Sequence, residues 1–256
     1  MKERVHKMVN ELISEKTKKD ADQEMEEKTQ KQISKQTETK VEEISLVKRL
    51  IAEFLGTYLL VFAGTGAVIL DFITGDLGHL GVSLLFGIAL LVAIYTFGHL
   101  SGAHINPAIT VGFLIQKKIN MLSAVSYIIS QILGALAASW TLYRMFGNVT
   151  NLGATLPIGT TLQTFALEAI LTYFLTIVIL SSIYGNQGKT FTGIAAGSIL
   201  FFGVFFGGPL TGGSLNPARS IGPAIISGAT EGLWIYIAAP LTGAILAALI
   251  SKFINE

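Results

Sequence analysis

Two stretches of this sequence decide its fold: Ser101-Gly-Ala-His-Ile-Asn-Pro-Ala-Ile-Thr110 and Gly212-Gly-Ser-Leu-Asn-Pro-Ala-Arg-Ser220. Each contains Asn-Pro-Ala after small residues, and each opens an apolar run about half as long as a membrane span. Asn is a good helix N-cap and Pro suits the first helical position, so one copy indicates only that a helix begins there. The pair, one copy in each half of the chain, predicts two matching half-helices.

Charged residues are concentrated near the N-terminus. The first 49 residues hold 12 of the 18 Lys and Arg and 11 of the 17 Asp and Glu, which leaves 6 basic and 6 acidic residues in the rest. A soluble domain carries roughly a quarter charged residues, whereas a charge at the bilayer centre costs at least ~2.5 kcal/mol. The chain beyond residue 49 is therefore predicted to lie in a membrane.

Six stretches are apolar and long enough to cross the ~30 Å hydrocarbon core as helices. They are predicted at 50–70, 80–100, 121–143, 162–184, 191–210 and 231–253. Two shorter apolar pieces, 105–116 and 215–227, are predicted to be re-entrant half-helices. The expected fold class is an all-α membrane protein with six transmembrane helices and two half-helices.

The chain also contains a weak internal repeat. Glu53-Phe-Leu-Gly-Thr-Tyr-Leu in the first span corresponds to Glu168-Ala-Ile-Leu-Thr-Tyr-Phe in the fourth. Half 1 covers about 47–146 and half 2 about 160–253, within a membrane domain of residues 47–256. Because each half has three spans, the second must enter the membrane from the opposite face, which predicts an inverted repeat with its functional site between the halves.

Residues 1–46 have a different composition, rich in Lys, Glu, Gln and Thr and without aromatic residues. They are predicted to be a mostly disordered charged tail. Within this tail, the spacing predicts one short amphipathic helix formed by Val5, Met8, Val9, Leu12 and Ile13.

The basic residues nearest the spans indicate the orientation. With six spans, six of them fall on the same side of the membrane: Lys48, Arg49, Lys117, Lys118, Lys189 and Lys252. Arg144 is the exception and falls on the other side. The positive-inside rule places that side, and both termini, in the cytoplasm. A multi-pass protein with cytoplasmic termini is therefore predicted.

Composition also excludes several classes of function. The net charge is +1 and basic residues alternate with acidic ones, so no nucleic acid is expected as a partner. The absence of cysteine excludes thiolate metal sites. We find no nucleophile with its base, no metal cluster and no phosphate loop in the sequence, so neither an enzyme, a metal nor a cofactor is expected.

The two motifs predict a pore. Half-helix N-termini that meet near the midplane direct their positive dipole ends at one point and repel cations. The side-chain oxygen of each Asn is expected to accept a hydrogen bond from its own helix, while the amide NH2 points into the lumen. A water molecule held by these two donors keeps its own hydrogens pointing away, which hinders proton transfer along a chain of waters. The predicted motif residues are Asn106, Pro107, Ala108, Asn216, Pro217 and Ala218.

Small residues precede each motif and are predicted to be extended. Irregular backbone at membrane depth is tolerated where it lines a watery cavity or is covered by protein. The carbonyl groups expected to line the pore are those of Gly102, Ala103, His104, Gly212 and Ser214. Arg219, alone in an apolar setting, is a functional candidate.

The stretches SGAHINPAIT, GGSLNPARS and AEFLGTYLL resemble the aquaporin (major intrinsic protein) family over residues 48–253. The resemblance implies an aquaporin-like fold in the cell membrane, assembled as a homotetramer with one pore per subunit. It implies passive passage of water and small neutral solutes, such as glycerol, metalloid acids and dissolved gases, with exclusion of protons and ions. In related channels, acids such as Glu53 and Glu168 hold the re-entrant loops by hydrogen bonds.

The family's narrowest filter is formed by four positions, which correspond here to Phe86, Val204, Gly213 and Arg219. Strict water channels usually have His in place of Val204, and Gly213 removes further bulk, so a wider and more apolar filter is expected. Within the family, Ser220 and Ala224 resemble the residues of the water-channel branch, whereas the pair Tyr236-Ile237 resembles the nodulin-26-like channels. Water with some permeability to small neutral solutes is predicted.

A secondary active transporter is the alternative, because inverted repeats with broken helices also describe that class. Such a protein needs more intramembrane ion ligands than Glu53 and Glu168 provide. Three further polar or unusual residues are interpreted as structural: His104 as a satisfied imidazole, and Gln131 and Pro240 as packing residues.

Overall fold

The computed structural model describes residues 23, 25–29, 44–182 and 188–255. The chain divides into two units, Met1–Ile44 and Ser45–Glu256. In the first unit, the described residues 23 and 25–29 are helical. The predicted amphipathic helix that begins near Val5, and the end of the fourth predicted span, lie outside the described residues.

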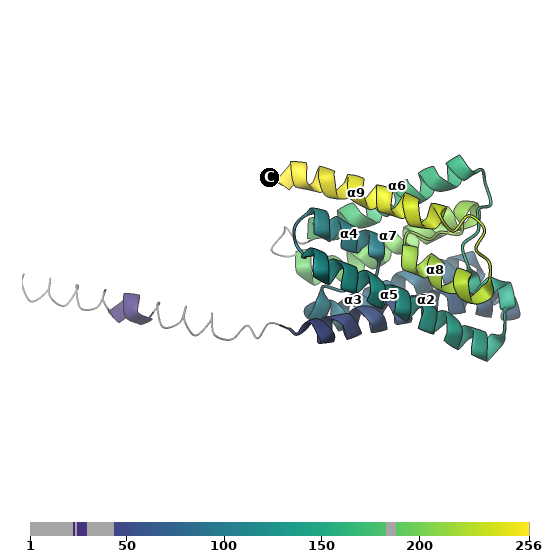
Figure 1. Cartoon of the computed structure of the whole chain (residues 1–256), viewed down its shortest axis with the longest axis horizontal. Helices are drawn as coiled ribbons and strands as arrows, with labels where there is room; N and C mark the ends of the chain where they lie inside the picture. Colours follow the sequence, from purple (N-terminus) through teal and green to yellow (C-terminus); the bar gives the residue numbers. More distant parts are fainter. Residues whose placement is uncertain (1–22, 24, 30–43, 183–187, 256) are drawn as a thin grey trace, which may run out of the picture. The chain divides into compact units, whose positions relative to one another are not determined.

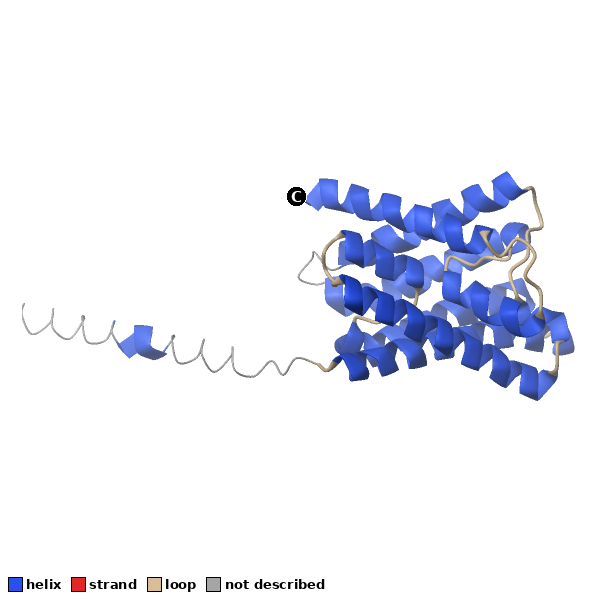
Figure 2. Ribbon diagram, in the orientation of Figure 1, coloured by secondary structure: helices blue, strands red, loops and turns tan. Residues whose placement is uncertain are grey.

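Throughout the described part of the second unit, the regular structure is helical (Figure 2). Its elements are α2 (Leu46–Thr74), α3 (Gly78–Ser101), α4 (Pro107–Ile115), α5 (Met121–Phe146), the 3-10 helix η1 (Val149–Gly153), α6 (Thr161–Ser182), α7 (Gly188–Thr211), α8 (Pro217–Ser227) and α9 (Ile235–Asn255). Within the described ranges, six of these helices are long and apolar enough to cross a membrane. The predicted fold class is confirmed.

The ends of the predicted spans differ by a few residues from the observed helices. The last span begins at Ile235 instead of 231, because residues 231–234 form a turn in which the Ile235 N–H donates to the Gly232 carbonyl at 2.9 Å. Such boundary shifts are expected when periodicity alone sets the ends of an element.

The two halves of the second unit interlock. In half 1, α2 packs on α3 and α5, and the corresponding helix of half 2, α6, packs on α7 and α9. The half-helices cross over, since α4 packs on α9 and α8 packs on α5 (Figure 1). The start of α2 and the end of α9 lie at the same end of the bundle, as an even number of spans requires (Figure 1).

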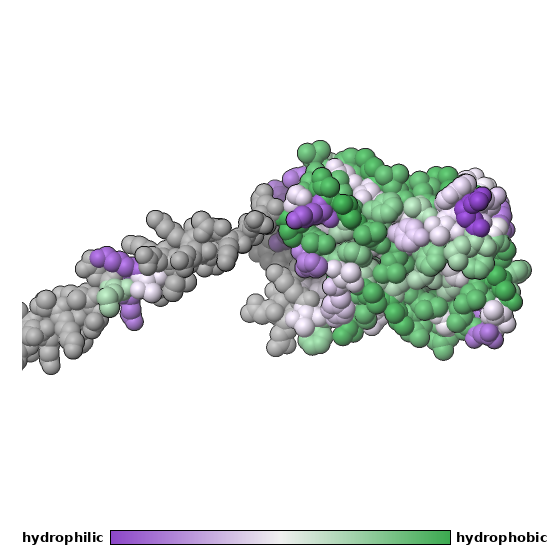
Figure 3. Space-filling model, turned by 90° about the horizontal axis from the view of Figure 1, so that it is seen from below, coloured by the Kyte–Doolittle hydropathy of each residue, from purple (hydrophilic) through white to green (hydrophobic). Residues whose placement is uncertain are grey.

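The bundle presents an apolar surface. Large apolar side chains are about half exposed on several spans, such as Leu84 on α3, Leu133 on α5 and Phe206 on α7. On the face drawn in Figure 3, apolar residues cover the middle of the second unit, and the most hydrophilic residues gather toward its ends. This distribution suits a protein whose solvent is a lipid bilayer.

Glycines allow the closest helix contacts at equivalent places in the two halves. A Cβ atom on Gly134 of α5 would collide with the Phe54 carbonyl oxygen of α2, and one on Gly243 of α9 would collide with the Ala169 carbonyl oxygen of α6. Small residues at helix interfaces let backbones approach in membranes. These contacts align the spans that support the two re-entrant loops.

Candidate functional site

Asn106 and Asn216 cap the two half-helices in the same way. Each has an extended backbone, and Pro107 or Pro217 follows as the first helical residue. The Oδ1 of Asn106 accepts from the Ala108 N–H at 2.9 Å, and that of Asn216 accepts from the Ala218 N–H at 3.0 Å. The side-chain oxygens therefore accept from the free backbone N–H groups at the helix N-termini, and the amide NH2 groups remain available for other acceptors.

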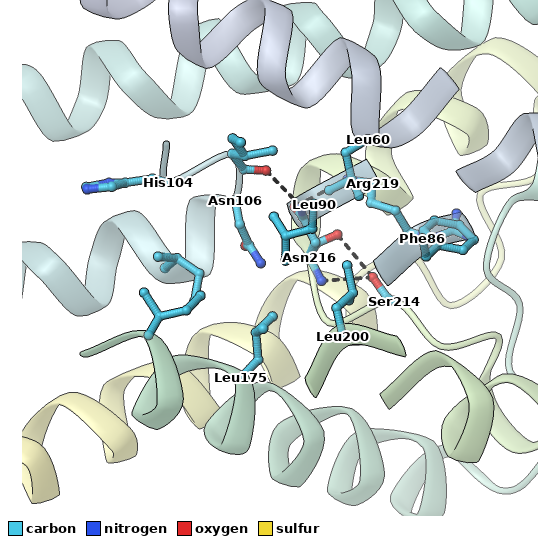
Figure 4. A pocket seen from close by; sticks show the side chains of 13 residues that line it. Leu60, Phe86, Leu90, His104, Asn106, Leu175, Leu200, Ser214, Asn216 and Arg219 are labelled. Carbon is cyan, nitrogen blue, oxygen red and sulfur yellow. Dashed lines mark hydrogen bonds between the residues drawn. The ribbon is translucent and has the colours of Figure 1, made fainter. Parts of the chain in front are cut away.

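The two Asn amides also tie the halves together. The Nδ2 of Asn106 donates to the Leu215 carbonyl at 2.8 Å, and the Nδ2 of Asn216 donates to the Ile105 carbonyl at 2.9 Å. An amide nitrogen carries two hydrogens, so one N–H on each Asn remains for another acceptor. Both side chains line the same cavity (Figure 4).

The loop before each motif has an unusual backbone. In half 1 the φ angles are positive at Gly102 (86°), Ala103 (48°) and Ile105 (56°). In half 2 they are positive at Gly212 (88°), Gly213 (62°) and Leu215 (54°). A left-handed conformation costs a residue other than glycine roughly 1–2 kcal/mol, so both loops need support from their surroundings.

Glu53 supports the first loop from α2. Its Oε1 accepts from the Ser101 hydroxyl at 2.6 Å and from the His104 N–H at 2.9 Å. Its Oε2 accepts from the Ile105 N–H at 2.7 Å and from the Gln131 Nε2 at 2.8 Å. The carboxylate is fully buried, and four donors hold it.

Glu168 supports the second loop from α6 in nearly the same geometry. Its Oε1 accepts from the Thr211 hydroxyl at 2.7 Å and from the Ser214 N–H at 2.9 Å. Its Oε2 accepts from the Leu215 N–H at 2.8 Å. The hydrogen bonds expected from both acids are present, with three donors here against four at Glu53.

Gln131 does more than fill space, which corrects its interpretation as a packing residue. Its Nε2 donates both to Glu53 and, at 2.9 Å, to the Thr110 hydroxyl, which links α5 to the first loop and to α4. An amide within an otherwise apolar span was the signal in the sequence, because polar groups at membrane depth need partners. Its partners could not be identified from sequence spacing.

A narrow cavity of ≈ 10 Å³ lies where the two loops meet (Figure 4). This volume leaves room for about one water molecule. Its polar side comes from the loops and α8, and consists of His104, Asn106, Ser214, Asn216 and Arg219. Its apolar side comes mainly from the long helices, with Leu60, Phe86, Leu90, Leu175, Ile179 and Leu200. We call it the central cavity.

A second cavity of ≈ 230 Å³, the outer cavity, shares only Phe86 and Arg219 with the central one. The guanidinium carbon of Arg219 lies 4.7 Å from the centre of the Phe86 ring. Its Nη1 donates to the Gly153 carbonyl at 2.8 Å, which fixes the side chain although it is nearly fully buried. The pair therefore lies at the junction of the two cavities.

The other two expected filter residues have different surroundings. Val204 lines the outer cavity, whereas Gly213 lines neither of the two. A Cβ atom on Gly213 would lie 3.1 Å from the Val204 Cα and 3.3 Å from the Gly208 N, against the backbone of α7. The absence of a side chain at Gly213 therefore allows close packing of the loop on α7.

The residues expected to present carbonyl groups divide between the two cavities. His104 and Ser214 line the central cavity and Gly212 lines the outer one, whereas Gly102 and Ala103 line neither. The outer cavity is also lined by Asp71 and His79, which the sequence did not point to. The Asp71 Oδ1 accepts from the Gly78 N–H at 2.7 Å at the start of α3, a contact that depends on the turn between α2 and α3.

A protein family, two relatives and a solved structure are each similar to this chain over most of its length. The family described as Major intrinsic protein matches residues 40–251. Nodulin-26 of Glycine max is 40% identical over 215 residues, which cover 83% of this chain and 79% of that protein. Glycerol uptake facilitator protein-like 6 of Lactiplantibacillus plantarum is 43% identical over 220 residues, or 82% of this chain and 99% of that protein. The structure of the aquaglyceroporin from Plasmodium falciparum matches with a TM-score of 0.74 and 28% identity, and covers 82% of this chain and 98% of that chain.

Proposed function

This chain belongs to the major intrinsic protein family and is a passive channel for water and small neutral solutes. We propose that its pore is narrowest where it passes the Phe86–Arg219 pair. The observation that carries the proposal is the arrangement of the two cavities, which share only these two side chains. A solute that moves from one cavity to the other has to pass alongside the Phe86 ring and the Arg219 guanidinium, which are in contact with each other.

The chemistry of this passage favours a small amphipathic solute. Part of the wall is apolar, with Phe86 and Val204, and Arg219, in contact with Phe86, carries hydrogen-bond donors. A polyol can place its carbons on the apolar wall and its hydroxyl groups toward the guanidinium, whereas a cation meets a fixed positive charge. We propose glycerol as a solute in addition to water, in keeping with the name of the Lactiplantibacillus plantarum relative.

The remaining features extend the same proposal. The free N–H groups of Asn106 and Asn216 donate to water at the centre of the pore, and backbone carbonyls of the two loops provide acceptors. Family membership supports passive conduction without an enzymatic step, whereas the relatives give no support to a secondary transporter. We place this multi-pass protein in the cell membrane with both termini in the cytoplasm, and residues 1–46 as a separate tail.

We also propose a homotetramer, which the family resemblance implies. The half-exposed apolar residues on α3 and α7, such as Leu84 and Phe206, provide surface for contacts between subunits or with lipid. Native mass spectrometry of the protein in mild detergent tests the assembly, with four subunits as the expected result.

The filter is tested in proteoliposomes by stopped-flow light scattering, first with sucrose and then with glycerol as the osmolyte. We expect fast shrinkage in both and re-swelling in glycerol. Val204→Phe should reduce glycerol permeability about tenfold and water permeability less, whereas Val204→Ala should raise glycerol permeability, since a difference of ~1.4 kcal/mol changes a rate tenfold. Val125→Phe, the same change at a half-exposed position of α5, is the control. Equal loss in both Phe variants would contradict the proposed filter.

A further inference from the structure

The imidazole of His104 lies at the end of the central cavity away from Phe86 and Arg219 (Figure 4). Its ring centre is 4.3 Å from that of Phe113 on α4 and 5.3 Å from that of Tyr127 on α5. The side chain is 5% exposed. Two aromatic neighbours therefore pack against a nearly buried ring.

The hydrogen bonds around Thr110 favour one position for the proton of the neutral His104 ring. The Thr110 hydroxyl has one hydrogen, and it donates this to the Asn106 carbonyl at 3.0 Å. The same oxygen accepts from the Gln131 Nε2 at 2.9 Å and lies 3.2 Å from the His104 Nδ1. With this hydrogen on the Asn106 carbonyl, the imidazole is the donor in the contact between Nδ1 and the Thr110 hydroxyl. In the neutral ring the lone pair is then on Nε2.

Nε2 of His104 has no hydrogen bond with any residue that the structure describes, and His104 lines the central cavity. We propose that Thr110 and Gln131 are positioning residues that hold His104 as the Nδ1–H tautomer, so that Nε2 is an acceptor for the permeating molecule. The assignment of the tautomer rests on these contacts alone. The role toward a permeating molecule rests on the proposed function.

This acceptor complements the donors at the centre of the pore. A water molecule that takes a hydrogen bond from an Asn amide and gives one to Nε2 has a fixed orientation, with its oxygen toward the motifs and a hydrogen toward His104. The corresponding residue of half 2, Ser214, donates its hydroxyl to the Asn216 carbonyl at 3.0 Å. The imidazole acceptor is therefore specific to half 1.

The tautomer can be measured by ¹⁵N solid-state NMR on the full chain, labelled at histidine and reconstituted in liposomes at alkaline pH, where free imidazole is neutral. The chain has 4 histidines, and the difference from His104→Asn identifies the signal of interest. We expect Nδ1 to be protonated and Nε2 unprotonated in the wild-type chain. A protonated Nε2 there would overturn the proposal, and this spectrum needs no variant of the positioning residues.

Variants then test the positioning. Thr110→Val removes the acceptor for Nδ1–H and should make Nε2–H appear, whereas Thr110→Ser keeps the hydroxyl and should restore the wild-type spectrum. Gln131→Met should also shift the tautomer. Thr211→Val removes a comparable donor from Glu168 in the other half and should leave the His104 signal unchanged. A wild-type His104 spectrum in Thr110→Val would overturn the positioning role.

Water permeability per channel completes the test. It should be about fivefold lower in Thr110→Val than in Thr110→Ser, the factor that corresponds to one hydrogen bond of ordinary net strength. Equal permeability despite a changed tautomer would overturn the role of Nε2 as an acceptor. A wild-type chain with the expected tautomer but no water conduction would instead contradict the proposed function.

Discussion

The loop before α4 and the loop before α8 have the same backbone path but different side-chain partners. In both, a buried glutamate accepts from the two backbone N–H groups that precede the Asn. In both, a tyrosine hydroxyl also donates to the backbone carbonyl at the start of the loop, from Tyr127 to Ser101 at 3.0 Å and from Tyr236 to Thr211 at 2.6 Å. The features that both loops share are those that hold strained backbone in place.

The differences are concentrated at the pore. Three residues after each Asn, half 1 has Ile109 and half 2 has Arg219, and both side chains line the central cavity. Two residues before each Asn, half 1 has His104 and half 2 has Ser214. The duplicated scaffold thus holds unlike groups at equivalent positions, which makes the two ends of the pore chemically different.

The largest effect is expected from removal of the loop supports. Glu53→Leu breaks four hydrogen bonds to a buried carboxylate and Glu168→Leu breaks three. At a lower bound of about 1 kcal/mol for each donor, the losses of stability are about 4 and about 3 kcal/mol. Thermal unfolding in detergent measures them, with the exposed Glu231→Gln as control. A larger loss at Glu168 would contradict the stronger support of half 1.

The second effect concerns the two Asn residues that join the halves. Asn106→Ala and Asn216→Ala each remove a helix cap and a hydrogen bond across the halves, for a loss of about 2 kcal/mol. Asn120→Ala removes only a cap, since its Oδ1 accepts from the Ser123 N–H at 2.8 Å, and should cost about 1 kcal/mol in the same unfolding assay. Equal losses in all three variants would mean that the bonds across the halves add nothing.

A third change makes the two halves alike at the constriction. Arg219→Ile places at this position the residue that half 1 already has, and removes the fixed positive charge. Proton or cation leak through proteoliposomes, followed with a pH-sensitive dye, should rise about tenfold, which corresponds to ~1.4 kcal/mol less repulsion. Arg144→Ile, at an exposed position of α5, should leave the leak unchanged. A leak that stays at the wild-type level would place ion exclusion elsewhere.

The smallest effect is expected from a contact present only in half 2. The Thr155 hydroxyl lies 2.7 Å from that of Ser220, which lies 2.6 Å from that of Ser214. Thr155→Val should lower stability by about 1 kcal/mol or less and leave glycerol permeability nearly unchanged, because Thr155 lines neither cavity. A tenfold fall in glycerol permeability would show that this chain of hydroxyls shapes the pore.

Much of this architecture could be predicted because its signals are local. The six spans follow from runs of apolar residues, and the half-helices from a cap and a proline at their starts. The two glutamates could be paired because the repeat places them at equivalent positions in the first and fourth spans. The four-residue difference at the start of α9 arose because the turn before Ile235 is apolar enough to extend the pattern.

Other features could not be predicted because they depend on which helices cross. Gln131 meets Glu53 only because α5 packs on α2, and the Nη1 of Arg219 meets the Gly153 carbonyl only because η1 lies beside α8. The close approach of Gly213 to the backbone of α7 is likewise a result of packing. Composition and spacing contain no information on such contacts.

The sequence by itself determined the membrane class, the internal repeat, the two half-helices and part of the polar lining of the central cavity, namely Asn106, Asn216 and Arg219. These follow from the energetic penalty on charge and unpaired backbone in lipid, which leaves few alternatives for a chain of this composition. Only the tertiary structure decided that Phe86 and Arg219 form the junction of two cavities, and that the Thr110 hydroxyl meets both the His104 Nδ1 and the Gln131 Nε2. The reason is physical: contacts between side chains of different helices and loops depend on how these elements pack, which no local pattern specifies.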